Sequence, residues 1–240
     1  MWFDLFIFVT MMVGSFVQTA TGFGCAIIIM SMWPMLLPVP EATQLLLFGT
    51  LVQSGYVAFK FRRHINFKIA IVPLLLALAG TCLGLTMLLN TDNTTAVRGI
   101  GVMLLVLALY FLVFSKRIRI PENLWTASAA GAISGVLSGF FNIAGPPIVL
   151  YYSAATKDKE EYTGTVQFIF VAMVVFKMVF LGVKRGLSEM VLTHAPFAIV
   201  GSTIGMLLGL RLFSKLSTAA IKKIIYILMV VAGIWYIIRP

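Results

Sequence analysis

Long apolar runs, with charged residues confined to their ends, constrain the fold of this chain more than any other feature. Most of the runs are about 20 residues long, the length that an α-helix needs to cross a bilayer. Hydrophobic residues make up 60% of the chain and charged residues 11%, and a soluble domain of 240 residues cannot bury that much apolar surface. We therefore predict an all-α, polytopic membrane protein. The apolar runs cover 3–37, 42–59, 69–90, 96–114, 124–156, 162–183, 191–213 and 219–238.

Two of these runs, the first and the fifth, are longer than one crossing and are interrupted near their middles. The first contains VQTATGFG at 17–24, and the fifth contains SGFFNIAGPP at 138–147. An unpaired backbone group in lipid is costly, so a helix is interrupted only where protein or a watery cavity receives the freed groups. Glycine permits a turn, and proline is favourable in the first turn of the next helix. We expect one broken helix, either re-entrant or discontinuous, at each position.

The two interruptions are related by an internal duplication. A shift of 121 residues carries 14–24, which begins and ends with glycine, onto 135–145, which does the same. The same shift carries 80–84 onto 201–205, again with glycine at both ends. We expect these last two segments to be helix-packing surfaces. The single transmembrane domain, 1–240, then divides into repeat 1 (1–115), a linker (116–123) and repeat 2 (124–240), each repeat holding one broken helix and three transmembrane helices.

The distribution of basic residues distinguishes two topologies. If every run crosses the membrane, the two repeats are parallel; if the interrupted runs return to the side they entered from, the repeats are inverted. The inverted arrangement leaves few basic residues outside, and the positive-inside rule favours it. The N-terminus then faces out, and the net charge of +10 lies mostly on the cytoplasmic face, where it attracts anionic lipid. The basic residues left outside are Arg98, Lys184, Arg185 and Arg239.

The interruptions carry groups suited to binding a small anion. The first amides of a half-helix are unpaired and carry the positive end of the helix dipole. Two such ends facing each other near the midplane occur in many secondary transporters. Lys177, well inside an apolar run, is either a counter-charge for the anion or extends to the interface. The candidate substrate-binding residues are Gln18, Thr21, Gly22, Phe23, Gly24, Gln53, Asn142, Ala144, Gly145, Pro146 and Lys177.

Catalysis and metal binding are not indicated. The acidic residues lie at the ends of runs or in loops, so no carboxylate stands at membrane depth. Neither a Ser–His pair nor paired Asp residues occur at matching depths. Cys25 and Cys82 lie in apolar runs without metal-binding spacing. We expect no enzyme activity, no cofactor and no metal; the scattered basic residues also argue against nucleic-acid binding.

At the two interruptions the chain resembles the TauE/SafE family of membrane permeases, the sulfite exporter family. The resemblance covers nearly the whole chain: its length, its two repeats and a Gly-rich break opening each half, here TGFG at 21–24 and NIAGPP at 142–147. The family pattern usually has a paired Gly-Gly at each break, where this chain has Phe23 and Ala144. The resemblance implies transport of sulfite or sulfur-containing organic anions, such as sulfonates, across the bacterial inner membrane.

We therefore expect a multi-pass secondary transporter, an exporter, for a small anion. Rocking of one repeat against the other would give alternating access. Its partners are the anion and membrane lipid, and a homodimer is compatible with the sequence. The alternative is a non-transporting membrane protein whose small-residue breaks pack against a partner or lipid. A channel is not favoured, because no ring of selecting charges is present.

Overall fold

The computed structural model describes residues 2–113, 121–212 and 218–240, without the side chains of 113 and 218–224. Within these residues all regular secondary structure is helical. This confirms the all-α class. The helices of this part of the chain are α1 (Trp2–Thr21), α2 (Cys25–Met30), α3 (Val39–Lys60), α4 (Phe67–Leu89), α5 (Asn93–Val113), α6 (Leu124–Phe141), α7 (Gly145–Ala155), α8 (Lys159–Arg185), α9 (Glu189–Leu212) and α10 (Thr218–Ile238), with short 3-10 helices η1 (Trp33–Met35) and η2 (Arg62–His64).

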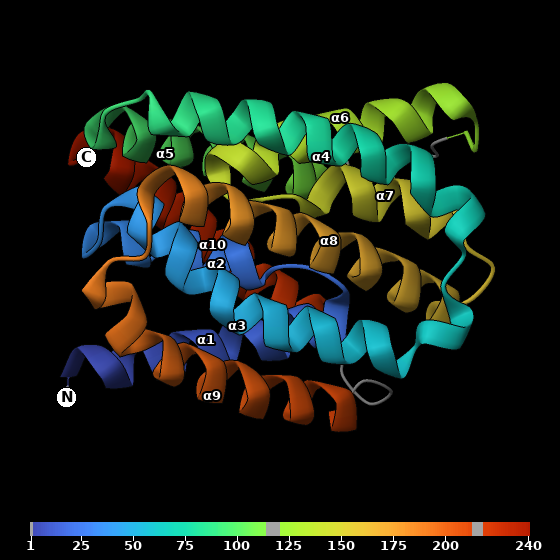
Figure 1. The fold of residues 1–240 in the computed structure, drawn as a ribbon, viewed down its shortest axis with the longest axis horizontal. Helices are drawn as coiled ribbons and strands as arrows, with labels where there is room; N and C mark the ends of the chain where they lie inside the picture. The colour runs from blue at the N-terminus through green and yellow to red at the C-terminus, as the bar shows by residue number, and fades with distance from the viewer. Residues whose placement is uncertain (1, 114–120, 213–217) are drawn as a thin grey trace.

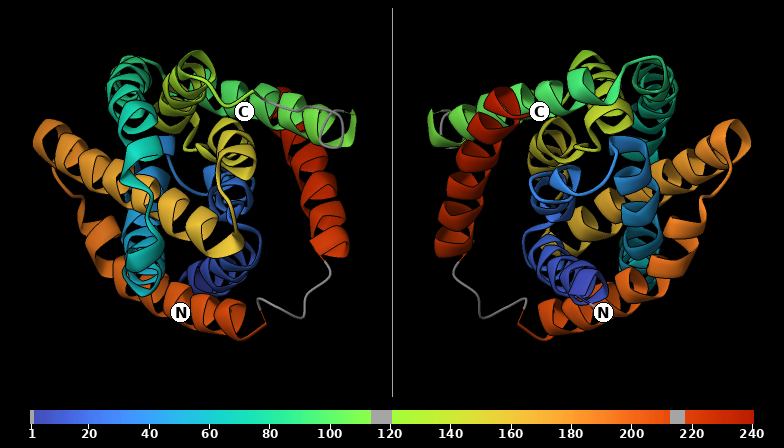
Figure 2. Two further views of the ribbon diagram at one scale, coloured as in Figure 1. Left: turned by 90° about the vertical axis from the view of Figure 1, so that its right-hand side faces the viewer. Right: turned by 90° about the vertical axis from the view of Figure 1, so that its left-hand side faces the viewer.

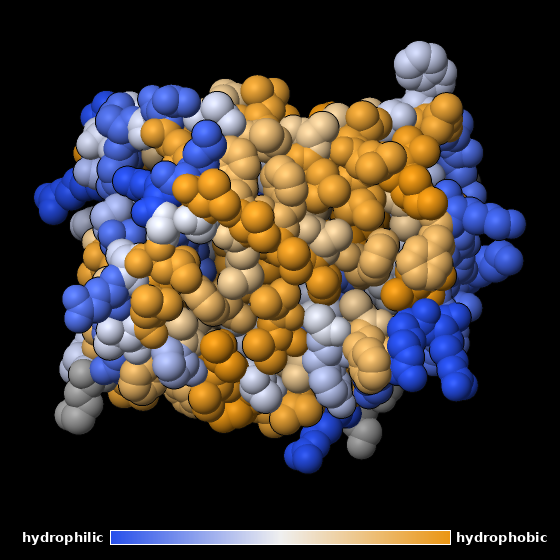
Figure 3. Space-filling view, in the orientation of Figure 1, coloured by the Kyte–Doolittle hydropathy of each residue, from blue (hydrophilic) through white to orange (hydrophobic). Residues whose placement is uncertain are grey.

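The surface and the helix lengths fit a bilayer. Six of the described helices, α1, α4, α5, α6, α8 and α9, are long and apolar enough to cross a membrane. Large apolar side chains such as Leu75, Leu109 and Val179 are exposed, which is favourable against lipid. In Figure 3, apolar side chains cover the middle of the visible face and hydrophilic side chains gather at its two ends. The predicted multi-pass membrane protein is confirmed.

The helices run mostly along one axis, in two directions (Figure 1). Both chain termini lie at the left-hand end in this view. Helix α1 starts at that end and α2 turns back towards it, whereas α6 starts at the right-hand end and α7 turns back towards the right. Helices α1 and α6 therefore begin at opposite ends of the molecule.

Helices of residues 1–115 pack mainly against helices of residues 124–240. Helix α1 packs against α9, α4 against α6, α3 against α8, and α5 against α10. Figure 2 shows α5 in bright green and α10 in red lying together at one side of the bundle. Because each pair joins the two parts of the chain, the two parts share extensive helix contacts.

Close helix packing depends on the glycines that the sequence assigned to it. A Cβ on Gly80 would lie 2.6 Å from the carbonyl oxygen of Ala132, and one on Gly84 would lie 2.5 Å from that of Val136. A Cβ on Gly201 or Gly205 would likewise overlap a backbone carbonyl oxygen of α1. The prediction that these glycines are packing surfaces is confirmed.

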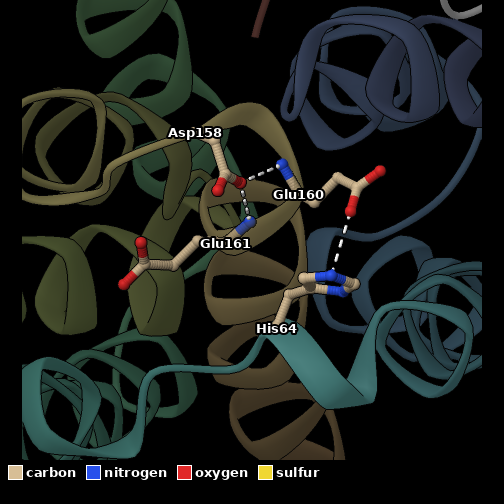
Figure 4. A network of polar contacts seen from close by, with 4 residues as sticks. All are labelled: His64, Asp158, Glu160 and Glu161. Carbon is tan, nitrogen blue, oxygen red and sulfur yellow. Dashed lines mark hydrogen bonds and ion pairs between the residues drawn. The ribbon is translucent and has the colours of Figure 1, made fainter.

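Polar contacts tie the loop after α3 to the start of α8 (Figure 4). Asp158 caps α8, its Oδ1 accepting from the amides of Glu160 at 2.9 Å and Glu161 at 2.8 Å. His64 Nε2 lies 3.0 Å from Glu160 Oε2, and Asn66 donates to Glu161 at 2.6 Å. These contacts fix the two connections at one end of the molecule.

The expected linker, 116–123, lies mostly outside the described residues, which resume at 121. The basic residues Lys116, Arg117, Arg119 and Lys215, on which the expected topology partly depends, also lie outside them.

Candidate functional site

The first interruption is a tight turn built on two glycines. Helix α1 ends at Thr21 and α2 begins at Cys25. Gly22 and Gly24 have φ angles of 91° and 117°, which side-chain-bearing residues rarely adopt. The Thr21 hydroxyl lies 2.9 Å from the carbonyl oxygen of Val17 and 2.6 Å from that of Phe23. Thr21 therefore satisfies backbone groups of the turn itself.

The second interruption is a left-handed helix end followed by a proline-led helix start. Asn142, with φ 63°, follows the last residue of α6, and the amide of Ile143 donates to the carbonyl oxygen of Leu137 at 3.2 Å. Helix α7 then begins at Gly145. Pro146 and Pro147 have no amide hydrogen, and the amide of Ile148 donates to Ser134 Oγ at 3.1 Å. Three of the four residues at 145–148 therefore offer no amide to a ligand.

The two interruptions meet in space although they are far apart in the sequence. A Cβ on Gly145 would lie 3.0 Å from Cβ of Phe23. Asn142 Nδ2 lies 3.9 Å from the sulfur of Met30, at the end of α2. The fold therefore brings both turns to one place, where they enclose a cavity.

This cavity measures about 60 Å³. A water molecule in the liquid occupies about 30 Å³, so the cavity has room for a small polyatomic ion or a few waters. Its walls come from α1, α3, α6, α8 and the segments after both interruptions. The lining residues are Gln18, Phe23, Gly24, Ala26, Ile27, Leu46, Leu47, Thr50, Ser54, Ser138, Asn142, Ile143, Ala144, Gly145, Phe170, Met173, Val174 and Lys177.

Lys177 of α8 lines this cavity and is 4% exposed. Its Nζ donates to Asn142 Oδ1 at the second interruption. The ammonium group therefore stays inside the protein and does not extend to the interface. Burying a cation is expensive unless an anion or several hydrogen bonds compensate it, and intramembrane ionisable residues are commonly functional for that reason.

Other polar groups surround the cavity. Gln18 Nε2 donates to Ser54 Oγ at 3.3 Å. Gln53, one residue away on α3, instead donates to Thr19 Oγ1 at 3.3 Å and does not line the cavity. Ser138 presents its buried side chain to the cavity from α6. Amide and hydroxyl donors thus accompany the ammonium group.

The structure brings together most of the residues selected from the sequence. Those that line the cavity are Gln18, Phe23, Gly24, Asn142, Ala144, Gly145 and Lys177. Those that do not are Thr21, Gly22, Gln53 and Pro146: Gly22 packs on Tyr162, and Pro146 lines a separate apolar hollow beside α5.

Three polar lining residues were not selected from the sequence: Thr50, Ser54 and Ser138. Thr50 and Ser54 are four residues apart, which places them on one face of α3. That spacing was the available signal. Ser138 gave none, because serine is common in tightly packed membrane helices.

The described part of the chain contains no cluster of His, Cys, Asp or Glu able to hold a metal ion. Among the lining residues Lys177 carries the only formal charge. The ionisable group on the described cavity wall is thus a lysine and not a carboxylate.

The fold defines a multi-pass helical membrane protein. The chain belongs to the TauE/SafE family, since the family model described as "Sulfite exporter TauE/SafE" matches residues 6–236. The chain is also 22% identical over 225 residues to the "Probable sulfite/organosulfonate exporter TauE" of Cupriavidus necator, covering 92% of this chain and 88% of that protein. No solved structure gives a significant match. The chain is thus a multi-pass bacterial membrane protein of an exporter family.

Proposed function

We propose that this protein is a secondary transporter that exports a small anion of oxidised sulfur, either sulfite or an organic sulfonate. The observation that carries the proposal is the buried Lys177 ammonium, held by Asn142 in a cavity between the two helix interruptions. The family description and the printed name of the Cupriavidus necator relative support the choice of sulfur oxyanions.

The donor set suits an oxyanion. A sulfite or sulfonate group presents three oxygen acceptors, and Lys177, Gln18 and Asn142 carry N–H donors on the cavity wall. Gly24 and Gly145 lie at the two helix starts, where their backbones can approach the ligand closely. Side chains contribute most of the donors, because two prolines and Ser134 leave α7 few free amides.

In the proposed site the remaining candidates act indirectly. Thr21 and Gly22 hold the turn that presents Phe23 and Gly24, and Pro146 fixes the start of α7. Gln53 braces α3 against α1 through Thr19. Phe23 and Ala144 line the cavity and limit its size.

We further propose that residues 1–115 and 124–240 form inverted repeats, each opened by a re-entrant helix pair. The opposite entry of the α1–α2 and α6–α7 hairpins supports this arrangement. The contacts do so as well, because α1 on α9 and α6 on α4 are equivalent pairings under exchange of the halves. Movement of one half against the other would then expose the cavity to each side in turn.

Thiol accessibility tests whether the cavity binds anions from water. Ser138→Cys places a thiol on the cavity wall, and Ser15→Cys is a matched control because Ser15 is fully buried and bonded to Ser202 away from the cavity. A small water-soluble thiol reagent should label S138C, and methanesulfonate should slow that labelling; S15C should behave as the wild type with its two native cysteines. Equal inertness of both variants would instead favour the non-transporting alternative, in which the breaks pack tightly.

A further inference from the structure

Lys177 is the one cationic side chain among the described residues that line the cavity, and no carboxylate is among them. The other lining residues are uncharged, and Asn142 supplies only a neutral carbonyl oxygen to Lys177. In the described part of the chain, the other titratable or charged groups on the elements that line the cavity or pack around α8 do not themselves line it; they are Asp4, Cys25, Glu41, Tyr56, Lys60, Arg62, Arg63, His64, Lys68, Cys82, Tyr151, Tyr152, Lys159, Glu160, Glu161, Tyr162, Lys184 and Arg185.

One buried cation sets the charge of the ligand that neutralises it. A monoanion beside Lys177 makes a neutral pair, whereas a dianion leaves one uncompensated negative charge in a low-dielectric interior. A ligand that also carries an ammonium group would place a second cation near Lys177 without a carboxylate to receive it. Phe170, Met173 and Val174 offer apolar contacts that suit an alkyl group.

We propose that the site selects a singly charged sulfur oxyanion without a cationic group, namely hydrogensulfite or a short alkyl sulfonate, over dianions and zwitterions. This inference rests on the proposed function and refines its substrate class. An uncompensated buried charge is strongly unfavourable, so the expected preference is roughly 100-fold or more.

Binding to the purified full-length protein tests the preference directly. Methanesulfonate, sulfate and taurine are compared by calorimetric titration as a monoanion, a dianion and a zwitterion. Methanesulfonate should bind roughly 100-fold more tightly than either of the other two. Affinities within about threefold of one another would overturn the inference while leaving anion transport intact.

The pH dependence of sulfite binding gives a second measurement. Sulfite changes from monoanion to dianion near neutral pH, while methanesulfonate stays singly charged. The ratio of sulfite affinity to methanesulfonate affinity should therefore fall about tenfold per pH unit above that ionisation. The ratio cancels any titration of Lys177 itself, and a ratio independent of pH would contradict selection of the monoanion.

A lysine substitution on the same helix provides the matched control. Lys177→Met removes the buried charge and should abolish the preference for methanesulfonate over taurine, while Lys184→Met removes an exposed charge of α8 and should leave it unchanged. Preference retained in K177M, with K177M folded by size-exclusion chromatography, would overturn the inference. If the wild type binds and transports none of these anions, the proposed function fails, and the inference with it.

Discussion

At the scale of single residues, the site depends on Asn142, which has two separable roles. Its backbone occupies the left-handed region at φ 63°, and its side chain accepts from the buried Lys177. Asparagine tolerates this conformation better than most residues, and its amide gives the ammonium a neutral partner. Substitutions at this position can therefore separate the geometry of the turn from the chemistry of the site.

We predict that the variants Asn142→Gly and Asn142→Ala differ from each other in stability but lose the same amount of anion affinity. Both lose the side-chain contact to Lys177, and anion affinity should fall about tenfold in each, as expected for a lost hydrogen bond to a charged group. Alanine is also disfavoured in the left-handed backbone conformation, so the free energy of unfolding of N142A should be about 1–2 kcal/mol lower than that of N142G. Thermal unfolding and anion titration of both variants measure the two effects. Equal stability would show that the turn relaxes without positive φ.

At the scale of helices, the chain relies on close backbone contact between its two halves. Gly80 on α4 lies against α6, and a methyl group there would press on rigid backbone. Gly182 on α8 has open space around its Cβ position and is the matched control.

Gly80→Ala should lower the free energy of unfolding by about 1–3 kcal/mol, the usual cost of overpacking. Gly182→Ala should leave it unchanged or raise it by up to about 1 kcal/mol, because alanine favours the helix. Thermal unfolding of both variants in detergent measures the two changes in the free energy of unfolding. Equal destabilisation by both substitutions would contradict the packing role of Gly80.

The start of α7 gives a second prediction for a helix. Ser134 is fully buried, and its hydroxyl accepts from the amide of Ile148. Ser134→Ala leaves that amide without a partner, which should cost about 1–3 kcal/mol. The loss should appear in thermal unfolding, and Ser153→Ala, at an exposed serine of α7, should cost little. A neutral S134A would mean that another acceptor replaces Ser134.

The sequence predicted the all-helical, membrane-spanning class because the apolar runs follow from local chemistry. Apolar run lengths define the spans, and Gly22, Gly24 and Pro146 mark where helices end and begin. The contact between Lys177 and Asn142 was not predictable, because it joins two helices whose relative rotation is set by packing. For the same reason, Gln18 and not the neighbouring Gln53 of α3 reaches the cavity.

At the scale of the whole molecule, the proposed inverted repeats place the loop after α3 in the cytoplasm and the loop after α8 outside. Lys68→Cys and Ser188→Cys place thiols near these two loops, at opposite ends of the bundle. In right-side-out vesicles, a membrane-impermeant thiol reagent should label S188C and not K68C, with the wild type as the background. Labelling of K68C alone would reverse the orientation of the protein.

Export of a small sulfur oxyanion through the cavity beside Lys177 is tested most directly by counterflow of labelled sulfite into proteoliposomes. The wild type and K184M should show saturable uptake of labelled sulfite that excess unlabelled sulfite drives. Uptake by K177M should be at least about tenfold lower, because the counter-charge is gone. No saturable flux in the wild type, or unchanged flux in a folded K177M, would contradict this function for the site.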